Sequence, residues 1–170
     1  YCMEIIHLIL GKANPQRMNG VNNVVHQLAT HQTLLGQHVQ VWGITPSPEG
    51  SFPDRNYETR LFQSYSNKFR IDHKLVKAIR ETSAETMFHL HGGFIPEFYH
   101  AVKILRAADR EFIFTPHGSY NTIALEKNHF VKSLYFPLFE KSVLSSAKMI
   151  HFLGKTEYEA VEKLIPGTHK

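Results

Sequence analysis

The stretch Asn19-Gly20-Val21-Asn22-Asn23-Val24-Val25 joins an apolar run to a helical pattern, and this junction decides the fold. The preceding run, residues 3–10, is almost continuously apolar, as expected of a parallel strand covered on both faces. The following residues repeat apolar side chains at helical spacing until Gly36 ends the pattern. Residues 39–44 are a second apolar run, so the three segments predict a βαβ unit.

The glycine turn inside this unit is a potential anion site. Backbone N–H groups in the first turn of a helix have no partners within the helix, and the helix dipole adds positive charge there. Gly20 has no Cβ that would keep a phosphate away, and Asn19 can cap the helix. Similar turns also occur in α/β folds without any ligand, so the pattern alone leaves both interpretations open.

Strand and helix patterns alternate along the rest of the chain. A loop rich in proline separates residue 44 from a short edge strand at 57–62, and Pro137 is expected to kink or split a helix. Thr156 and Glu159 have the spacing of a capping box. Helices are expected at 71–81, 98–108, 131–143 and 156–164, and strands at 86–90, 111–115 and 149–153. This order predicts an α/β fold, a Rossmann-like doubly wound parallel sheet with helices on both faces.

Composition predicts a single globular domain over residues 1–170. The chain is 42% hydrophobic and 20% charged, which argues against disorder. It has no apolar run of the ~20 residues that a membrane span needs, no signal-peptide pattern, and a single cysteine, Cys2. These features predict a cytoplasmic protein.

The net charge of +4 includes a modest basic cluster at residues 55–80. This cluster is either an ordinary solvated surface or a surface attracted to an anionic membrane or a phosphorylated substrate. No nucleic-acid-binding motif is present, so nucleic acid is not an expected partner.

Three segments at expected strand ends are candidates for a ligand site. They are the Gly20 turn, His91-Gly92-Gly93 and His117-Gly118. In doubly wound sheets, ligands bind beyond the carboxyl ends of the strands, where glycines leave the backbone accessible. The convergence of three such segments indicates a cleft more strongly than any one of them.

Other kinds of site have less support. His89, His91 and His117 suggest metal binding, and strand alternation puts the first two on one face, but no acidic or cysteine ligand lies at suitable spacing. We therefore expect no metal or other cofactor, and we expect His89 to be hydrogen-bonded inside the sheet. The chain also lacks a dinucleotide fingerprint, a phosphate loop and a nucleophile elbow.

Several segments together resemble the N-terminal domain of a GT-B glycosyltransferase of family 4, of the group 1 type. The first are the Asn19-Gly20-Val21 turn with its helix, and Leu35-Gly36-Gln37-His38-Val39-Gln40-Val41. The others are Phe88-His89-Leu90-His91-Gly92, Phe114-Thr115-Pro116-His117-Gly118, and residues 132–159 with Phe139-Glu140-Lys141. The resemblance covers residues 3–165, and the Thr-Pro-His-Gly element with the Phe-Glu-Lys helix is its most specific part.

The resemblance implies a retaining hexosyltransferase that uses a nucleotide-sugar donor and two Rossmann-like domains facing a cleft. This chain would be the acceptor-binding half and inactive alone, because the C-terminal nucleotide-sugar domain with its Glu-x7-Glu region is absent. His117 matches the histidine beside the transferred sugar, and Asn19, Gly20 and Gly118 match segments that contact the donor diphosphate. His91 and Gly92 match a cleft segment on the acceptor side. The family often has two glycines at the turn, and Asn19 replaces the first.

The expected partners are a nucleotide sugar, a glycan or lipid-linked acceptor and the C-terminal domain. Polysaccharide, O-antigen or capsule synthesis would fit, with peripheral contact at the anionic inner membrane face. The alternative function is a stand-alone binding module with the same sheet, which would hold a phosphorylated ligand or a protein partner.

Overall fold

The computed structural model describes residues 3–16 and 20–167. Within these residues, six parallel strands form one sheet in the order β3-β2-β1-β4-β5-β6. The strands are β1 (Glu4–Leu10), β2 (His38–Thr45), β3 (Glu58–Gln63), β4 (Met87–His91), β5 (Phe112–Thr115) and β6 (Met149–Ile150). This order is that of a doubly wound Rossmann-like sheet, which confirms the predicted fold class.

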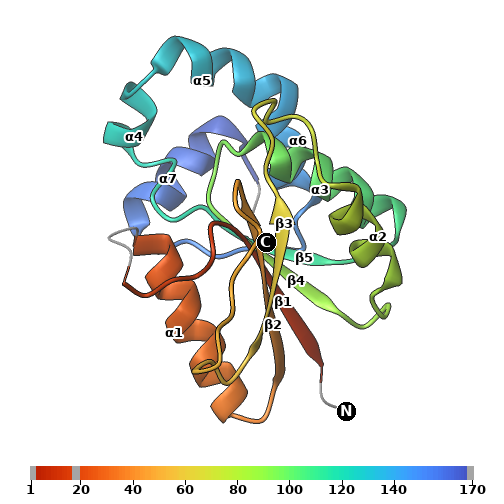
Figure 1. Cartoon of the computed structure of the whole chain (residues 1–170). Coiled ribbons are helices and arrows are strands. Elements are labelled where there is room, and N and C mark those ends of the chain that lie inside the picture. The colour runs from red at the N-terminus through yellow and green to blue at the C-terminus, as the bar shows by residue number, and fades with distance from the viewer. Residues whose placement is uncertain (1–2, 17–19, 168–170) are drawn as a thin grey trace.

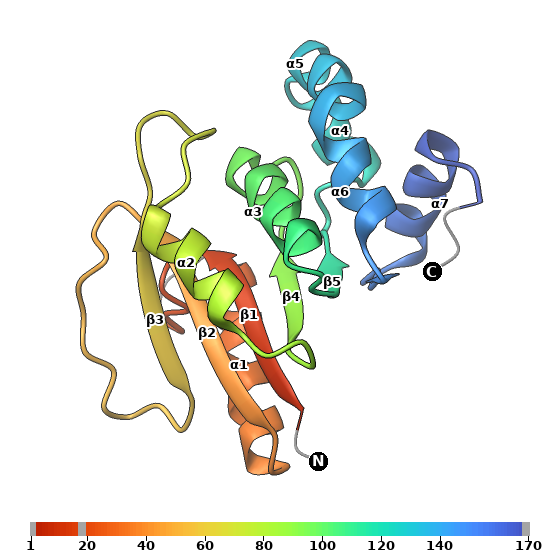
Figure 2. The same cartoon turned by 90° about the vertical axis from the view of Figure 1, so that its right-hand side faces the viewer.

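Helices cover both faces of this sheet (Figures 1 and 2). They are α1 (Gly20–Leu34), α2 (His73–Glu81), α3 (Pro96–Ala107), α4 (Thr122–Glu126), α5 (His129–Tyr135), α6 (Lys141–Ser146) and α7 (Lys155–Leu164). The predicted βαβ unit is confirmed as β1, α1 and β2. The predicted edge strand is also confirmed, because β3 pairs only with β2 in the described part of the chain.

Two apolar clusters lie on opposite faces because strand side chains alternate. Even-numbered residues of β1 and β4, such as Leu8 and Phe88, enter a large core with α2, α3 and α6. Ile9 of β1 packs in a smaller cluster with Val25 and Ala29 of α1. Odd-numbered positions therefore face α1, which decides where the histidines of β1 and β4 lie.

Three predictions about the second half of the chain need correction or refinement. The helical path continues through Pro137 as a π-helical turn, Phe136–Glu140, between α5 and α6. A wider turn accommodates a residue that has no backbone N–H. The capping box was wrong, because α7 begins after Gly154 with no side-chain cap. The last strand is also shorter than predicted, and α4 was not predicted.

The crossing of the β1 exit loop over β2 depends on a glycine. A Cβ added at Gly43 would lie 2.1 Å from the Gly11 carbonyl oxygen, and the Gly11 N–H donates to the Ile44 carbonyl at 2.9 Å. Gly43 lies inside β2, and the hydrogen bond to Ile44 holds Gly11 against the same strand. A side chain at position 43 would therefore force the β1 exit loop away from β2.

We predict that Gly43→Ala lowers the free energy of unfolding by at least about 2 kcal/mol, measured by urea denaturation, because of this overlap. Gly20→Ala is the control: no described atom lies within 4 Å of the added Cβ, and alanine favours the helix by roughly 0.5–1 kcal/mol. Equal effects of the two substitutions would contradict the proposed close approach.

Candidate functional site

The predicted site segments lie at the carboxyl end of the sheet. Gly20 is the exposed first residue of α1, and Asn19 lies outside the described residues. His91 ends β4 and Gly92 follows it, while His117 and Gly118 follow β5. The segments after β4 and β5 are joined directly, because Gly93 N–H donates to Ser119 Oγ at 3.1 Å.

The turn after β5 has a strained backbone. Its two central residues, His117 (φ 54°) and Gly118 (φ 79°), are both in the left-handed region, as in a type I′ turn. Ser119 N–H donates to the Pro116 carbonyl at 3.3 Å and closes the turn, and Ser119 Oγ donates to the same carbonyl. A histidine held at positive φ costs free energy, and such residues cluster at functional sites.

Buried carboxylates hold this turn in place. Glu157 Oε1 of α7 accepts a hydrogen bond from the Tyr120 N–H at 3.5 Å, and burial raises the pKa of this carboxyl group. Glu140 accepts from the Phe94 N–H at 2.7 Å and from the Tyr120 hydroxyl, and burial raises its pKa too. The two carboxyl groups therefore anchor Tyr120, which follows the turn, through its backbone N–H and its hydroxyl group.

A row of histidines crosses the sheet on the face that carries α1. Register pairs His7 of β1 with His89 of β4, and the rings of His89 and His91 are 4.0 Å apart between centroids. His89 Nε2 lies 2.7 Å from Thr115 Oγ1, which confirms the predicted hydrogen bond inside the sheet. Strand alternation predicted the shared face of His89 and His91, and the structure confirms it.

Hydrogen bonds extend this row from α1 to the strained turn. His7 Nε2 lies 2.7 Å from Gln32 Oε1, and His7 Nδ1 lies 2.9 Å from His91 Nε2. His91 Nδ1 in turn lies 2.9 Å from His117 Nε2. We call Gln32, His7, His91 and His117 the histidine chain. Its first two members were missed by the sequence analysis, because neither lies in a local motif.

Burial distinguishes the two predicted histidines. His91 is 2% exposed and uses both ring nitrogens within the protein, so its side chain does not line an open cleft. Gly92 is buried as well. His117 is half-buried, and no hydrogen bond to its Nδ1 is found among the described residues. The part played by His91 and Gly92 in acceptor binding stays a prediction, and for the His91 side chain it can only be indirect.

Burial also keeps the histidines neutral. It lowers the pKa of His7 to about 4, and it lowers the pKa of His117 to about 4 with help from repulsion by His151. Burial and the neighbouring histidines lower the pKa of His89 to about 3, and that of His91 well below its usual range. Each ring therefore carries one proton at neutral pH, with one donor and one acceptor nitrogen.

His7, His89 and His91 are the described residues best placed to hold a metal ion, with one nitrogen from each within 4.8 Å of the others.

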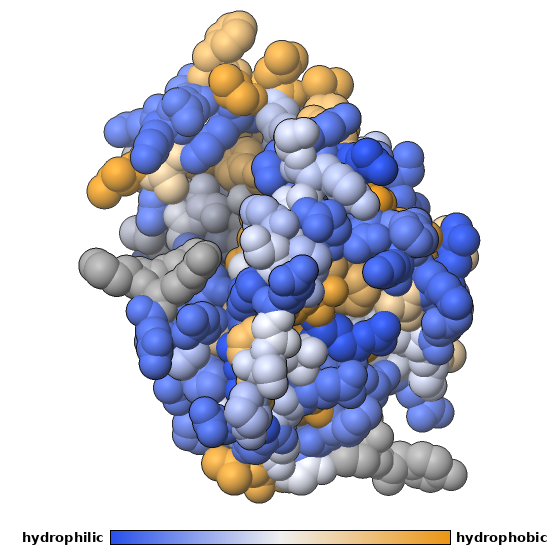
Figure 3. Space-filling model, in the orientation of Figure 1, coloured by the Kyte–Doolittle hydropathy of each residue, from blue (hydrophilic) through white to orange (hydrophobic). Residues whose placement is uncertain are grey.

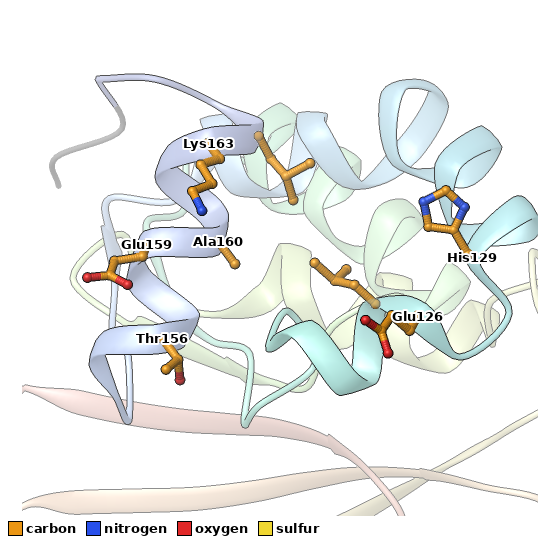
Figure 4. A pocket seen from close by; sticks show the side chains of 8 residues that line it. Glu126, His129, Thr156, Glu159, Ala160 and Lys163 are labelled. Carbon is orange, nitrogen blue, oxygen red and sulfur yellow. The ribbon is translucent and has the colours of Figure 1, made fainter.

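A second group of side chains, around α4 and α7, lines an open cavity of about 350 Å³ (Figure 4). Figure 4 shows Thr156 and Lys163 on α7 facing Glu126 and His129 across this cavity. In the described part of the chain, no helix is both long and apolar enough to cross a bilayer.

We predict that acidification from pH 6.5 to pH 4 destabilises the chain, because the unfolded histidines take up protons that the buried ones do not. For His7, whose pKa falls from 6.5 to about 4, the full contribution is on the order of 3 kcal/mol. His7→Gln should therefore show a shallower dependence of the unfolding free energy on pH over this window.

Urea denaturation at several pH values measures these slopes. His31→Gln removes an exposed imidazole from α1 and should follow the wild-type curve. If wild type and His7→Gln lose stability in parallel between pH 6.5 and pH 4, His7 is not held neutral by burial.

Comparison with known proteins gives one informative match. A comparison with curated proteins finds no match. Crystal structures of S. aureus homoserine dehydrogenase at pH 7.0 and pH 6.5 align over 89% of this chain, with 12% and 10% sequence identity and TM-scores of 0.42 and 0.40. The chain spans 32% of the length of those proteins, and a likeness at this level supports no inference. The sequence profile of Glycosyltransferase Family 4, in contrast, matches residues 18–167, and the chain belongs to this family.

Proposed function

We propose that this chain is the acceptor-binding half of a retaining glycosyltransferase that moves a hexosyl group from a nucleotide sugar to a glycan or lipid-linked acceptor. The observation that supports this most is the strained His117-Gly118 turn at the carboxyl end of the sheet, in a chain of Glycosyltransferase Family 4. Polysaccharide, O-antigen or capsule synthesis is the process that we propose. The protein would act in the cytoplasm, at the inner membrane face.

His117 would act on the transferred sugar as a neutral hydrogen-bonding group. Burial lowers its pKa to about 4, so at neutral pH it adds no positive charge beside an oxocarbenium-like transition state. The hydrogen bond between its Nε2 and His91 Nδ1, 2.9 Å long, holds the ring relative to β4. A preorganised group of this kind stabilises a transition state without having to reorganise during the reaction.

The leaving diphosphate would lie near the N-terminus of α1, at Gly20. The exposed glycine and the absence of an acidic residue from the first turn suit an anion. Stabilisation by a helix N-terminus requires no metal, and the proposal includes no cofactor. A C-terminal nucleotide-sugar domain would supply the other wall of the site, so residues 1–170 alone would bind donor weakly and would not catalyse transfer.

An apolar surface on α4, α5 and the following π-helical turn supports a lipid-linked acceptor. Figure 3 shows apolar side chains gathered over these helices, which in Figure 1 lie at the end of the molecule opposite the N-terminus. The exposed apolar residues are Ile123 (81%), Phe130 (82%), Val131 (64%), Leu134 (60%) and Leu138 (57%). Exposed Lys127 follows α4, and exposed Lys141 begins α6 directly after the π-helical turn. Apolar side chains flanked by lysines suit the surface of an anionic membrane.

We predict that His117→Asn, in the enzyme that joins this chain to its nucleotide-sugar domain, lowers kcat at least about 100-fold. Asparagine tolerates the left-handed backbone, so the fold should be kept, and thermal unfolding checks this. His31→Asn, an exposed position on α1, is the control. Turnover within a few-fold of wild type would remove His117 from the site.

We predict that the chain binds vesicles with anionic lipid more tightly than neutral vesicles, as measured by co-sedimentation, and that added salt weakens this binding. The double substitution Ile123→Ser and Phe130→Ser should weaken binding at least about 10-fold, because both exposed apolar side chains are lost. Leu34→Ser with Leu35→Ser is the matched control, since these leucines are 72% and 80% exposed at the end of α1.

Two outcomes would count against the membrane surface. Equal binding by the α4–α5 variant and the control variant would place the contact elsewhere on the chain. Concentration-dependent dimerisation that only the α4–α5 variant abolishes, without vesicle binding, would show that a second copy covers the surface.

A further inference from the structure

The histidine chain joins four side chains end to end. Gln32 comes from α1, His7 from β1 and His91 from β4, while His117 lies in the turn after β5. The three links measure 2.7, 2.9 and 2.9 Å between nitrogen or oxygen atoms. Each is a good hydrogen-bond distance. The histidine chain therefore leads from the contact between α1 and β1 to His117, the half-buried residue of the candidate site.

His7 and His91 are hydrogen-bonded through both ring nitrogens, and His117 ends the histidine chain. The direction of one hydrogen bond therefore fixes the direction of the next. Gln32 Oε1 is a carbonyl oxygen and can only accept, so His7 Nε2 carries the proton and His7 Nδ1 is an acceptor. His91 Nε2 must then donate to His7 Nδ1, which leaves His91 Nδ1 as an acceptor. His117 Nε2 must donate to it, and His117 Nδ1 keeps its lone pair.

These tautomers persist only if no ring in the histidine chain gains a second proton. His7 is fully buried and His91 is 2% exposed, and no acidic side chain among the described residues is hydrogen-bonded to either. The desolvation that lowers the pKa of each ring keeps all three neutral at pH 7. A row of neutral rings has only two possible directions, and the atom of residue 32 that faces His7 Nε2, here Gln32 Oε1, selects between them.

A metal ion at His7, His89 and His91 would compete with this arrangement. Two nitrogens bound to one tetrahedral zinc at ~2.0–2.1 Å lie roughly 3.4 Å apart. His7 Nδ1 and His91 Nε2 are 2.9 Å apart, which is the distance of a hydrogen bond between them. A metal ion bound to both rings would therefore have to displace the proton that lies between them.

We propose that Gln32 is a positioning residue that sets the tautomer of His117 through His7 and His91, so that His117 presents Nδ1 as an acceptor to a substrate hydroxyl group. The last step, the contact with substrate, rests on the proposed function. The control of the His117 tautomer by Gln32, which we call the relay, involves only residues of the 170-residue protein. It assigns a role to a glutamine that is connected to His117 only through the rings of His7 and His91 in the histidine chain.

The relay is tested by reversing the group at its start. Gln32→Lys places a donor-only group beside His7 Nε2, which should reverse all three hydrogen bonds and move the proton of His117 from Nε2 to Nδ1. Gln32→Glu is acceptor-only and should keep it on Nε2. Long-range proton–nitrogen correlation spectra of the 15N-labelled 170-residue chain at pH 7.5 report the tautomer of each ring directly.

Two controls separate the relay from a general disturbance. Gln27→Lys adds the same charge at an exposed position of α1 and should leave His117 protonated at Nε2. In a His7→Phe background the relay is interrupted, so glutamine and lysine at position 32 should give the same His117 tautomer. A His117 tautomer that does not respond to Gln32→Lys, or wild-type His117 protonated at Nδ1, would overturn the proposal. Stoichiometric binding of added Zn²⁺ with loss of the His7 and His91 ring protons would also overturn it.

Activity then tests the substrate contact separately. In the enzyme that includes the nucleotide-sugar domain, Gln32→Lys should lower kcat at least about 10-fold, while Gln32→Glu should keep most of the wild-type kcat. A reversed tautomer with unchanged kcat would leave the relay standing and contradict the proposed role of His117 in transfer. An unchanged tautomer with lowered kcat would contradict the relay instead.

Discussion

Buried ring nitrogens must find hydrogen-bond partners, and this requirement organises the α1 face of the sheet. His7 and His91 are 0% and 2% exposed, and each satisfies both of its nitrogens within the protein. The partners come from α1, from two adjacent strands and from the turn after β5. A helix, the sheet and the candidate site are thus linked by one set of polar contacts, in a region that an all-apolar core would have left unlinked.

The same contacts connect stability with the chemistry that we propose. Burial that makes the rings costly to protonate also keeps His117 neutral, which suits a group beside a developing positive charge. The strain at His117 is opposed by specific bonds: the Ser119 N–H closes the turn, and Glu157 accepts a hydrogen bond from the Tyr120 N–H. The surrounding carboxylates and hydroxyls therefore act as a rigid support, and the half-buried imidazole is the group left for a ligand.

Local patterns in the sequence predicted most of the fold, because apolar periodicity and glycine positions are properties of short segments. The strand-end positions of Gly20, His91 and His117 followed from the same reasoning. The histidine chain could not be found in this way: His7 and His91 are 84 residues apart, and only the strand order brings them together. Helix α4 was missed because five residues are too few to show a period.

The most direct test of the account is a structure of the enzyme that includes the nucleotide-sugar domain, determined with an intact, non-transferable donor analogue bound. We expect a hydroxyl group of the donor sugar within about 3 Å of His117 Nδ1, and the diphosphate at the N-terminus of α1. A donor held away from both groups, with His117 Nδ1 hydrogen-bonded only to water, would contradict the proposed site.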